Sequence, residues 1–194
     1  MMNFDFWRHK LRARLFLLLH RPEKAAREYE AALRHDLGNP TALNSLAWLH
    51  AGARRYGEAE SLFQEALRRR PQDAVALFNL GFVRDQQGKQ REAIEAFARA
   101  VALKPSIDRA WYGMGLAHAA LGEHDAAAAA LQKAAELQPM NGQAWYHLGM
   151  AFHTLHQADR VEEVIRHLHR FDPKLAQKLI TDAGRTDLVH LIGT

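Results

Sequence analysis

Residues 108–141 read DRAWYGMGLAHAALGEHDAAAAALQKAAELQPMN, and the pattern of this stretch recurs along the chain. Moved back by 34 residues it aligns with residues 74–107, and moved forward by 34 residues it aligns with residues 142–175. Small, large and helix-breaking residues fall at the same positions each time. Self-similarity at a fixed period of this size indicates an array of identical supersecondary units.

The columns of the repeat separate small residues from large ones. One small column holds Ala47, Gly81, Gly115 and Gly149, and another holds Ala25, Ala59, Ala93 and Ala127. A large apolar column holds Tyr29, Phe63, Phe97, Leu131 and Ile165. Apolar residues lie three and four apart within each unit, which is helical spacing. Small residues let two antiparallel helices approach closely while large ones fill the space between them, so each unit is predicted to be a helix hairpin.

The ends of the predicted helices carry start and stop signals. Pro71, Pro105, Pro139 and Pro173 recur just after the second helix of their units, where proline cannot continue a helix. Asn39 followed by Pro40 combines a capping side chain with proline at the first helical position, and Asp73 is a second capping residue.

These residues resemble the tetratricopeptide repeat (TPR) family. Its pattern is matched by Trp111, Met114, Gly115, Ala127, Leu131, Ala134 and Pro139, and again by Trp145, Leu148, Gly149 and Phe152. The resemblance implies an all-α fold: a right-handed superhelical α-solenoid of antiparallel helix hairpins with a C-terminal capping helix. We expect one array over residues 1–194. Its repeats are 6–39, 40–73, 74–107, 108–141 and 142–175, followed by a capping segment at 176–194.

In TPR arrays the first helix of each unit lines the concave side, so the resemblance also implies a candidate groove. One column of first-helix residues is Lys10, Asn44, Phe78, Tyr112 and Tyr146, and the next is Arg14, Trp48, Phe82, Leu116 and Met150. The columns are four residues apart and share a helical face, and Arg109 belongs to a column at their edge. These side chains either bind a peptide or helix of a partner protein or pack between adjacent repeats.

One subset of the family clamps the C-terminal carboxylate of chaperones with Lys and Asn side chains from three units. Lys10 matches the first Lys of that pattern, but Arg14 and Ser45 replace two of its asparagines. Among the later units only Asn79 and Arg109 fit. We therefore do not expect a carboxylate clamp.

The leading functional hypothesis is a non-catalytic protein-interaction scaffold. The alternative is a self-associating assembly protein that uses the N-terminal helix or the apolar tail at residues 188–192. We expect no enzyme activity and no cofactor, because no glycine-rich phosphate loop, nucleophile motif or metal-ligand pair with a supporting carboxylate is present. His147, His153, His156, His167 and His169 are interpreted as polar surface of a terminal repeat rather than as metal ligands.

The 194 residues include no cysteine and have a net charge of +4 with histidine neutral. Cysteine is needed for disulfides and thiolate metal sites, so both are excluded. The run Arg68-Arg69-Arg70 suits the C-terminal end of a helix dipole.

Without a basic stripe interleaved with aromatic residues, a nucleic-acid partner is not expected. The apolar run 15–19 is far too short to span a bilayer, and we expect a cytoplasmic protein.

Residues 4–20 form an amphipathic pattern that allows two interpretations. Phe4, Trp7, Leu11, Leu15 and Leu18 share one helical face, and the charged residues among them are mostly basic. Such a helix can bind a membrane surface peripherally or meet an acidic partner. The simpler interpretation, which we prefer, is the first helix of the first repeat, with this apolar face packed on the next helix.

Overall fold

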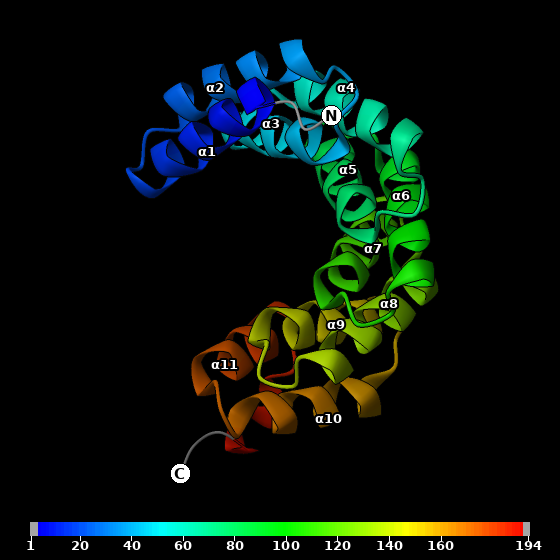
Figure 1. Ribbon diagram of the computed structural model, residues 1–194. Helices are drawn as coiled ribbons and strands as arrows, with labels where there is room; N and C mark the ends of the chain where they lie inside the picture. Colours follow the sequence, from blue (N-terminus) through cyan, green and yellow to red (C-terminus); the bar gives the residue numbers. More distant parts are fainter. Residues whose placement is uncertain (1–3, 192–194) are drawn as a thin grey trace. The chain divides into compact units, whose positions relative to one another are not determined.

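The computed structural model describes residues 4–191, and within that range it contains eleven α-helices, one short 3-10 helix and no strand (Figure 1). The helices are α1 (Phe4–Leu18), α2 (Pro22–His35), α3 (Pro40–Gly52), α4 (Tyr56–Arg69), α5 (Ala74–Gln86), α6 (Gln90–Leu103), α7 (Asp108–Ala120), α8 (His124–Leu137), α9 (Gly142–Thr154), α10 (Ala158–His169), α11 (Pro173–Asp182) and η1 (Thr186–Leu191). The predicted all-α fold of consecutive helix hairpins is confirmed.

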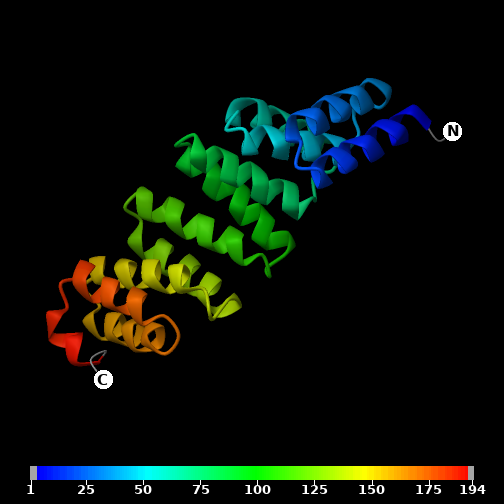
Figure 2. The ribbon, with the colours of Figure 1, turned by 90° about the vertical axis from the view of Figure 1, so that its left-hand side faces the viewer.

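The chain contacts group into two compact units, one ending at Leu103 and the other beginning at Lys104. Unit 1 holds three hairpins, formed by α1 with α2, α3 with α4, and α5 with α6. Unit 2 holds two hairpins, α7 with α8 and α9 with α10, followed by α11 and η1 (Figure 2). Inside each unit the second helix of a hairpin packs on the first helix of the next. That the repeats form one continuous array remains a prediction.

Helix starts agree with the sequence signals. Asn39 and Asp73 each accept a hydrogen bond from the backbone N–H three residues later, at 3.1 Å and 3.0 Å. Asn141 and Asp172 cap α9 and α11 in the same way, so these side chains satisfy N–H groups that have no partner inside the helix. The column residue before α7 is Ile107, which gives no side-chain cap.

Close approach of the two helices of a hairpin explains the small column. A Cβ atom added to Gly81 would lie 2.6 Å from the ring of Phe97, and one added to Gly115 would lie 2.6 Å from Leu131. In the last hairpin a Cβ on Gly149 would lie 2.5 Å from Leu179 of α11. Large side chains of the second helices are therefore seated directly on the backbone of the first helices.

The packing of α1 corrects the sequence interpretation. α1 does pack on α2, but through Phe6 and Ala13, which are buried, with Phe16 and Leu17 half-buried beside them. The apolar face that we expected to be covered, Phe4, Trp7, Leu11, Leu15 and Leu18, is exposed. Ala13 lies 34 residues before Ala47, in the small column. The buried face of α1 is therefore the one that carries the small residue of the repeat pattern, Ala13, where α2 can approach closely.

The C-terminal segment caps unit 2, as predicted. Leu175, Leu179, Ile180 and Leu188 are buried in one core cluster with α9 and α10 residues. Val189 is exposed. Ile192, which belonged to the predicted apolar tail, lies outside the described residues.

Glu60 of α4 joins consecutive repeats in unit 1 through a charged hydrogen-bond cluster. Its carboxylate is only 8% exposed and accepts hydrogen bonds from Arg84 at 2.9 Å, Lys89 at 2.7 Å and Gln87 at 3.0 Å. Burial acts to raise the pKa of Glu60, but the hydrogen bonds from Lys89, Arg84 and Gln87 outweigh it and lower the pKa to about 2. The ionised form of Glu60 is therefore favoured in the folded chain.

We predict that Glu60 makes stability depend on pH. The folded pKa lies below the ordinary value of 4.5, so the stabilisation is complete above that ordinary pKa and is lost as the pH falls toward about 2. It amounts to about 2–3 kcal/mol. Urea unfolding of wild type and Glu60→Gln should differ by that amount at pH 7 and converge near pH 2. A difference that stays constant with pH would contradict this assignment.

The turn inside each hairpin places one residue in the left-handed region, always at the same column. These residues are His20, Arg54, Gly88, Gly122 and His156, with φ between 54° and 76°. A residue with a Cβ atom is strained in this region, whereas glycine is not. Three of the five turns thus carry backbone strain that the other two avoid.

Arg54→Gly should therefore stabilise the chain by about 0.5–1 kcal/mol, after allowing for the greater entropy of glycine in the unfolded state. Gly88→Ala is the matched reverse change and should destabilise it by about 1 kcal/mol. A Cβ atom at Gly88 would meet nothing within 4 Å, so the loss there comes from the backbone alone. Urea unfolding measures both, and a less stable Arg54→Gly protein would refute the strain.

Candidate functional site

The first helices of unit 1 present the aromatic part of the predicted strip to solvent. Trp48 of α3 is 58% exposed and Phe82 of α5 is 43% exposed. Phe78 is half-buried, with its ring centroid 6.0 Å from that of Phe97. Trp48 and Phe82 belong to the same column, one repeat apart, and are large apolar side chains that their own unit leaves uncovered.

A hollow of about 310 Å³ adjoins Trp48. It is lined by side chains of α1, α3, α5 and the connection before α5: Leu17, Thr41, Asn44, Ser45, Trp48, Arg70, Asp73 and Asn79. The lining combines an apolar wall with amide and hydroxyl groups, and its charged residues, Arg70 and Asp73, are of opposite sign. We call this hollow the Asn44 pocket.

Asn44 has an unused hydrogen-bond acceptor in this pocket. Its Nδ2 donates to Asp73 Oδ2 at 3.3 Å, while Asp73 Oδ1 caps α5. The Oδ1 atom of Asn44 is buried and has no hydrogen-bond partner among the described residues. Leaving a buried acceptor unpaired costs about 1–3 kcal/mol. Oδ1 has almost no accessible surface, so a group in the pocket reaches it only after the Asn44 side chain turns.

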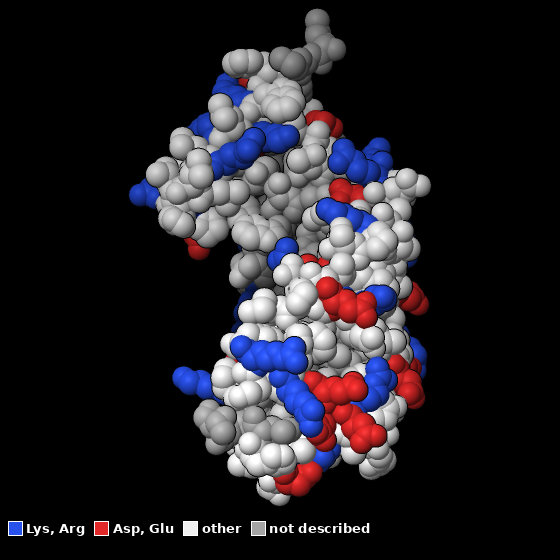
Figure 3. Space-filling model, turned by 90° about the horizontal axis from the view of Figure 1, so that it is seen from below, with Lys and Arg blue, Asp and Glu red and all other residues white. Residues whose placement is uncertain are grey.

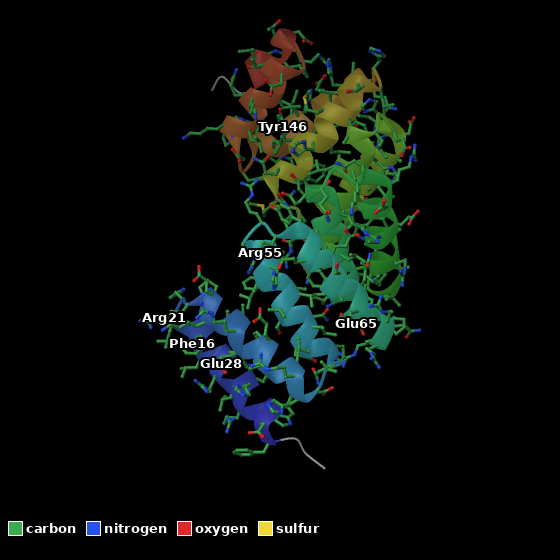
Figure 4. The ribbon with its side chains drawn as sticks, turned by 90° about the horizontal axis from the view of Figure 1, so that it is seen from above. Phe16, Arg21, Glu28, Arg55, Glu65 and Tyr146 are labelled. Atoms are coloured by element: carbon green, nitrogen blue, oxygen red, sulfur yellow. The ribbon has the colours of Figure 1, made fainter. Side chains whose placement is uncertain are left out.

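Trp48 also lines a second hollow, of about 280 Å³, on its other side. That hollow is bounded by α2 and the end of α3: Pro22, Glu23, Ala26, Leu49, Gly52, Ala53 and Arg55. Arg55 is labelled in Figure 4. Trp48 thus belongs to the lining of both hollows and can contact a ligand in either.

The two predicted basic residues of the strip do not line either hollow. Lys10 of α1 lies over the ring of Trp7, with Nζ 4.7 Å from the ring centroid. Arg14 is exposed on the same helix. Of the predicted strip in unit 1, the Asn44 pocket therefore brings together Asn44 and Trp48, whereas Lys10, Arg14, Phe78 and Phe82 line neither hollow.

In unit 2 the corresponding residues are engaged with neighbouring helices. The hydroxyl of Tyr146 donates to Asp182 of α11 at 2.5 Å, and Nζ of Lys178 lies 4.7 Å from the centroid of its ring (Figure 4 labels Tyr146). The hydrogen bond to Asp182, burial and the negative charge of Asp182 together raise the pKa of Tyr146 to about 12. α11 therefore holds Tyr146 in place.

The other strip residues of unit 2 are mostly covered as well. Tyr112 and Met150 pack against the core cluster, and burial raises the pKa of the Tyr112 hydroxyl. The ring of Tyr112 lies 5.8 Å from that of His147, whose pKa is lowered by burial and by the charge of Lys178. Leu116 is half-buried, and Arg109 is exposed at the edge.

The histidines of the last repeat occupy unrelated places. His167 lies against Trp145, with 4.0 Å between ring centroids, and His153 and His156 are exposed. Among the residues that the structure describes, no three histidine or acidic side chains come close enough to hold a metal ion.

Sequence reasoning missed several groups that shape the site. Ser45, Arg70 and Asp73 line the Asn44 pocket, and Asp182 captures Tyr146. The sequence marked Asp73 as a helix cap, although not as a pocket residue. No sequence pattern marked Asp182 as a partner of Tyr146, because α11 lies outside the repeat that relates the other helices.

A family model described as tetratricopeptide repeat matches residues 10–74, 78–139 and 112–160, which is well over half of the chain. The chain belongs to the TPR family. The residues that shape the Asn44 pocket thus come from the first helices of TPR units and the connections between them. A search of curated protein sequences finds no match.

Solved structures of other TPR proteins share the fold. MamA from Desulfovibrio magneticus RS-1, as a fragment from residue 41 to its end, is 23% identical with a TM-score of 0.79, covering 94% of this chain and 98% of that one. YrrB, described as a TPR protein with an unusual peptide-binding site, is 23% identical with a TM-score of 0.78, covering 89% and 90%. PilF of Pseudomonas aeruginosa is 17% identical with a TM-score of 0.72, covering 96% and 91%.

Proposed function

We propose that this TPR protein is a non-catalytic scaffold that binds an extended peptide of a partner protein over the first helices of unit 1. The observation that carries the proposal is the Asn44 pocket, where a buried amide oxygen without a partner adjoins an exposed tryptophan. Membership of the TPR family agrees with an interaction role, and YrrB is described as binding a peptide.

The chemistry of the pocket favours an extended peptide over a helix. An extended segment has free backbone N–H and C=O groups, whereas those of a helix are paired internally. The amide of Asn79 and the hydroxyl groups of Thr41 and Ser45 line the pocket and can pair with backbone groups of a peptide. Trp48 and Phe82 then take apolar side chains of the ligand, and such buried aromatic anchors supply most of the energy in interfaces of this kind.

The charge of the pocket sets a further property of the ligand. Arg70 Nη1 lies 3.8 Å from Asp73 Oδ2, so the two charges in the lining largely offset each other. Neither a strongly acidic nor a strongly basic peptide is selected there. We therefore expect a ligand segment with apolar side chains and little net charge, in contrast to the terminal carboxylate that a clamp would recognise.

We predict that Trp48→Ala combined with Phe82→Ala weakens partner binding by about 1000-fold, because each anchor contributes about 2 kcal/mol. Both side chains are exposed, so helix content and stability should hardly change. The measurement is affinity capture from native lysate with mass spectrometry, followed by titration of the captured protein.

The matched control is Leu37→Ala combined with Leu103→Ala, which removes two exposed apolar side chains of unit 1 that line neither hollow. This variant should capture the same protein as wild type. If the Trp48/Phe82 variant captures it equally well, the partner binds elsewhere. Recovery of the chain alone by all three forms would favour self-association instead.

A further inference from the structure

α1 has two apolar faces, and only one of them is covered. Phe6, Ala13, Phe16 and Leu17 face the core of unit 1. The opposite face holds Phe4, Trp7, Leu11, Leu15 and Leu18, and Leu19 follows it; we call these six residues the α1 stripe. All six are at least half-exposed, with Leu11 70% and Leu15 53% exposed. Exposure of so many large apolar side chains in one row indicates an interaction surface.

Contacts on the covered side hold α1 in this orientation. Glu28 of α2 lies 2.7 Å from His9 and 3.1 Å from Arg12, and its place beside α1 is labelled in Figure 4. Figure 2 shows α1 lying alongside α2 in the N-terminal hairpin. The stripe is therefore displayed on a helix that is already folded, so binding through it costs little ordering entropy.

The stripe differs from the face that packs between repeats. At the positions of Trp7, Leu11 and Leu18, α3 carries Thr41, Ser45 and Gly52, and α9 carries Gln143, His147 and Thr154. Only the column of Leu15 is apolar and buried in those helices, as Leu49 and Ala151. Small or polar residues there let the preceding helix approach. Trp7, Leu11 and Leu18 are bulkier and more apolar than the residues at the same positions of α3 and α9, so the stripe differs in character from the face that those helices turn to a preceding repeat.

Basic side chains flank the stripe on both sides. At 100° per residue, Arg8 and Arg12 follow one edge, and Lys10 and Arg14 follow the other. Asp5 is the single acidic residue of α1 and lies 3.1 Å from Arg8. Figure 3 shows Lys and Arg side chains in the upper part of the view, with uncharged and a few acidic side chains among them.

This combination identifies the type of surface that fits. A second copy of α1 placed face to face would bring two rows of basic residues together, which opposes a symmetric dimer. Phenylalanine, tryptophan and leucine between two basic edges are typical of helices that lie in the interface of an anionic bilayer. Long basic side chains can reach lipid headgroups while the apolar row enters the acyl region.

We propose that the α1 stripe binds the surface of anionic lipid bilayers, with α1 lying in the plane of the membrane. The 15 residues of α1 extend about 22 Å, less than the roughly 30 Å of a hydrocarbon core. None of the helices between Phe4 and Leu191 combines the length and apolar content needed to cross a bilayer. The attachment is thus peripheral.

The test is flotation of the full chain with vesicles of phosphatidylcholine alone or with about 30 mol% phosphatidylserine. Wild type should float with the anionic vesicles and only weakly with the neutral ones. Leu11→Gln combined with Leu15→Gln should weaken binding to anionic vesicles at least about tenfold. The matched control, Leu137→Gln combined with Met140→Gln, removes two exposed apolar side chains of unit 2 and should bind like wild type.

A charge variant keeps the test independent of any effect on folding. Arg8→Gln combined with Arg14→Gln leaves the apolar stripe intact, so its binding to anionic vesicles should fall toward the weak level of neutral vesicles, which it should bind as wild type does. Circular dichroism checks that each variant keeps its helix content.

Three results would overturn the proposal. One is the absence of wild-type binding to anionic vesicles, and another is unchanged binding by the Leu11/Leu15 variant. The third is a wild-type dimer in size-exclusion chromatography with light scattering that becomes monomeric in that variant, without vesicle binding. This last result would assign the stripe to a second copy of the chain.

Discussion

The close approach of two helices within each hairpin is the constraint on which this structure depends. Gly81 and Gly115 provide it by leaving room for Phe97 and Leu131 directly over the helix backbone. The short distance between the two helices goes together with three other features of each unit. These are the left-handed residue in the turn, the cap before the next first helix, and the face that the unit offers to the neighbouring repeat. The same constraint explains α1. Its small Ala13 faces α2, and its larger residues are left outside.

The repeats share the same backbone arrangement, but the side-chain contacts at equivalent positions differ in chemistry from one repeat to the next. A first-helix residue near the turn meets a second-helix residue eight positions later. The pairs are Phe16 with Lys24, His50 with Glu58, Arg84 with Glu92 and Phe152 with Arg160. A cation meets an aromatic ring in the terminal repeats, and a carboxylate meets a basic side chain in the second and third. In the fourth, Ala126 takes the place of the charged partner and His118 lies 2.7 Å from Glu123 instead. Each position thus retains an attraction while its chemistry varies.

The sequence predicted the hairpins well because the period repeats the same packing problem five times. It predicted the capping role of Asn39 and Asp73 because these residue types favour the N-cap position. The prediction of the buried face of α1 was wrong. This helix has two apolar faces, and we expected the larger one to pack on α2. The alignment of Ala13 with Ala47 in the small column already indicated the other face. The sequence could not tell which residues of the predicted strip are exposed and which are held by other helices. Tyr146 is hydrogen-bonded to Asp182 of α11, whereas Trp48 is exposed. This difference depends on α11, a capping helix that lies outside the repeat. The unpaired oxygen of Asn44 depends on side-chain conformation, which no spacing reveals.

We propose that the two units differ in their first-helix aromatic residues, which bind a partner in unit 1 and pack internally in unit 2. Photo-crosslinking tests this most directly, with a benzophenone amino acid placed at Trp48 in one protein and at Tyr146 in another. In native lysate, position 48 should give an adduct with a partner protein, and position 146 should give links within the chain, to α11. Partner adducts from position 146 alone, or equally from both positions, would contradict the account.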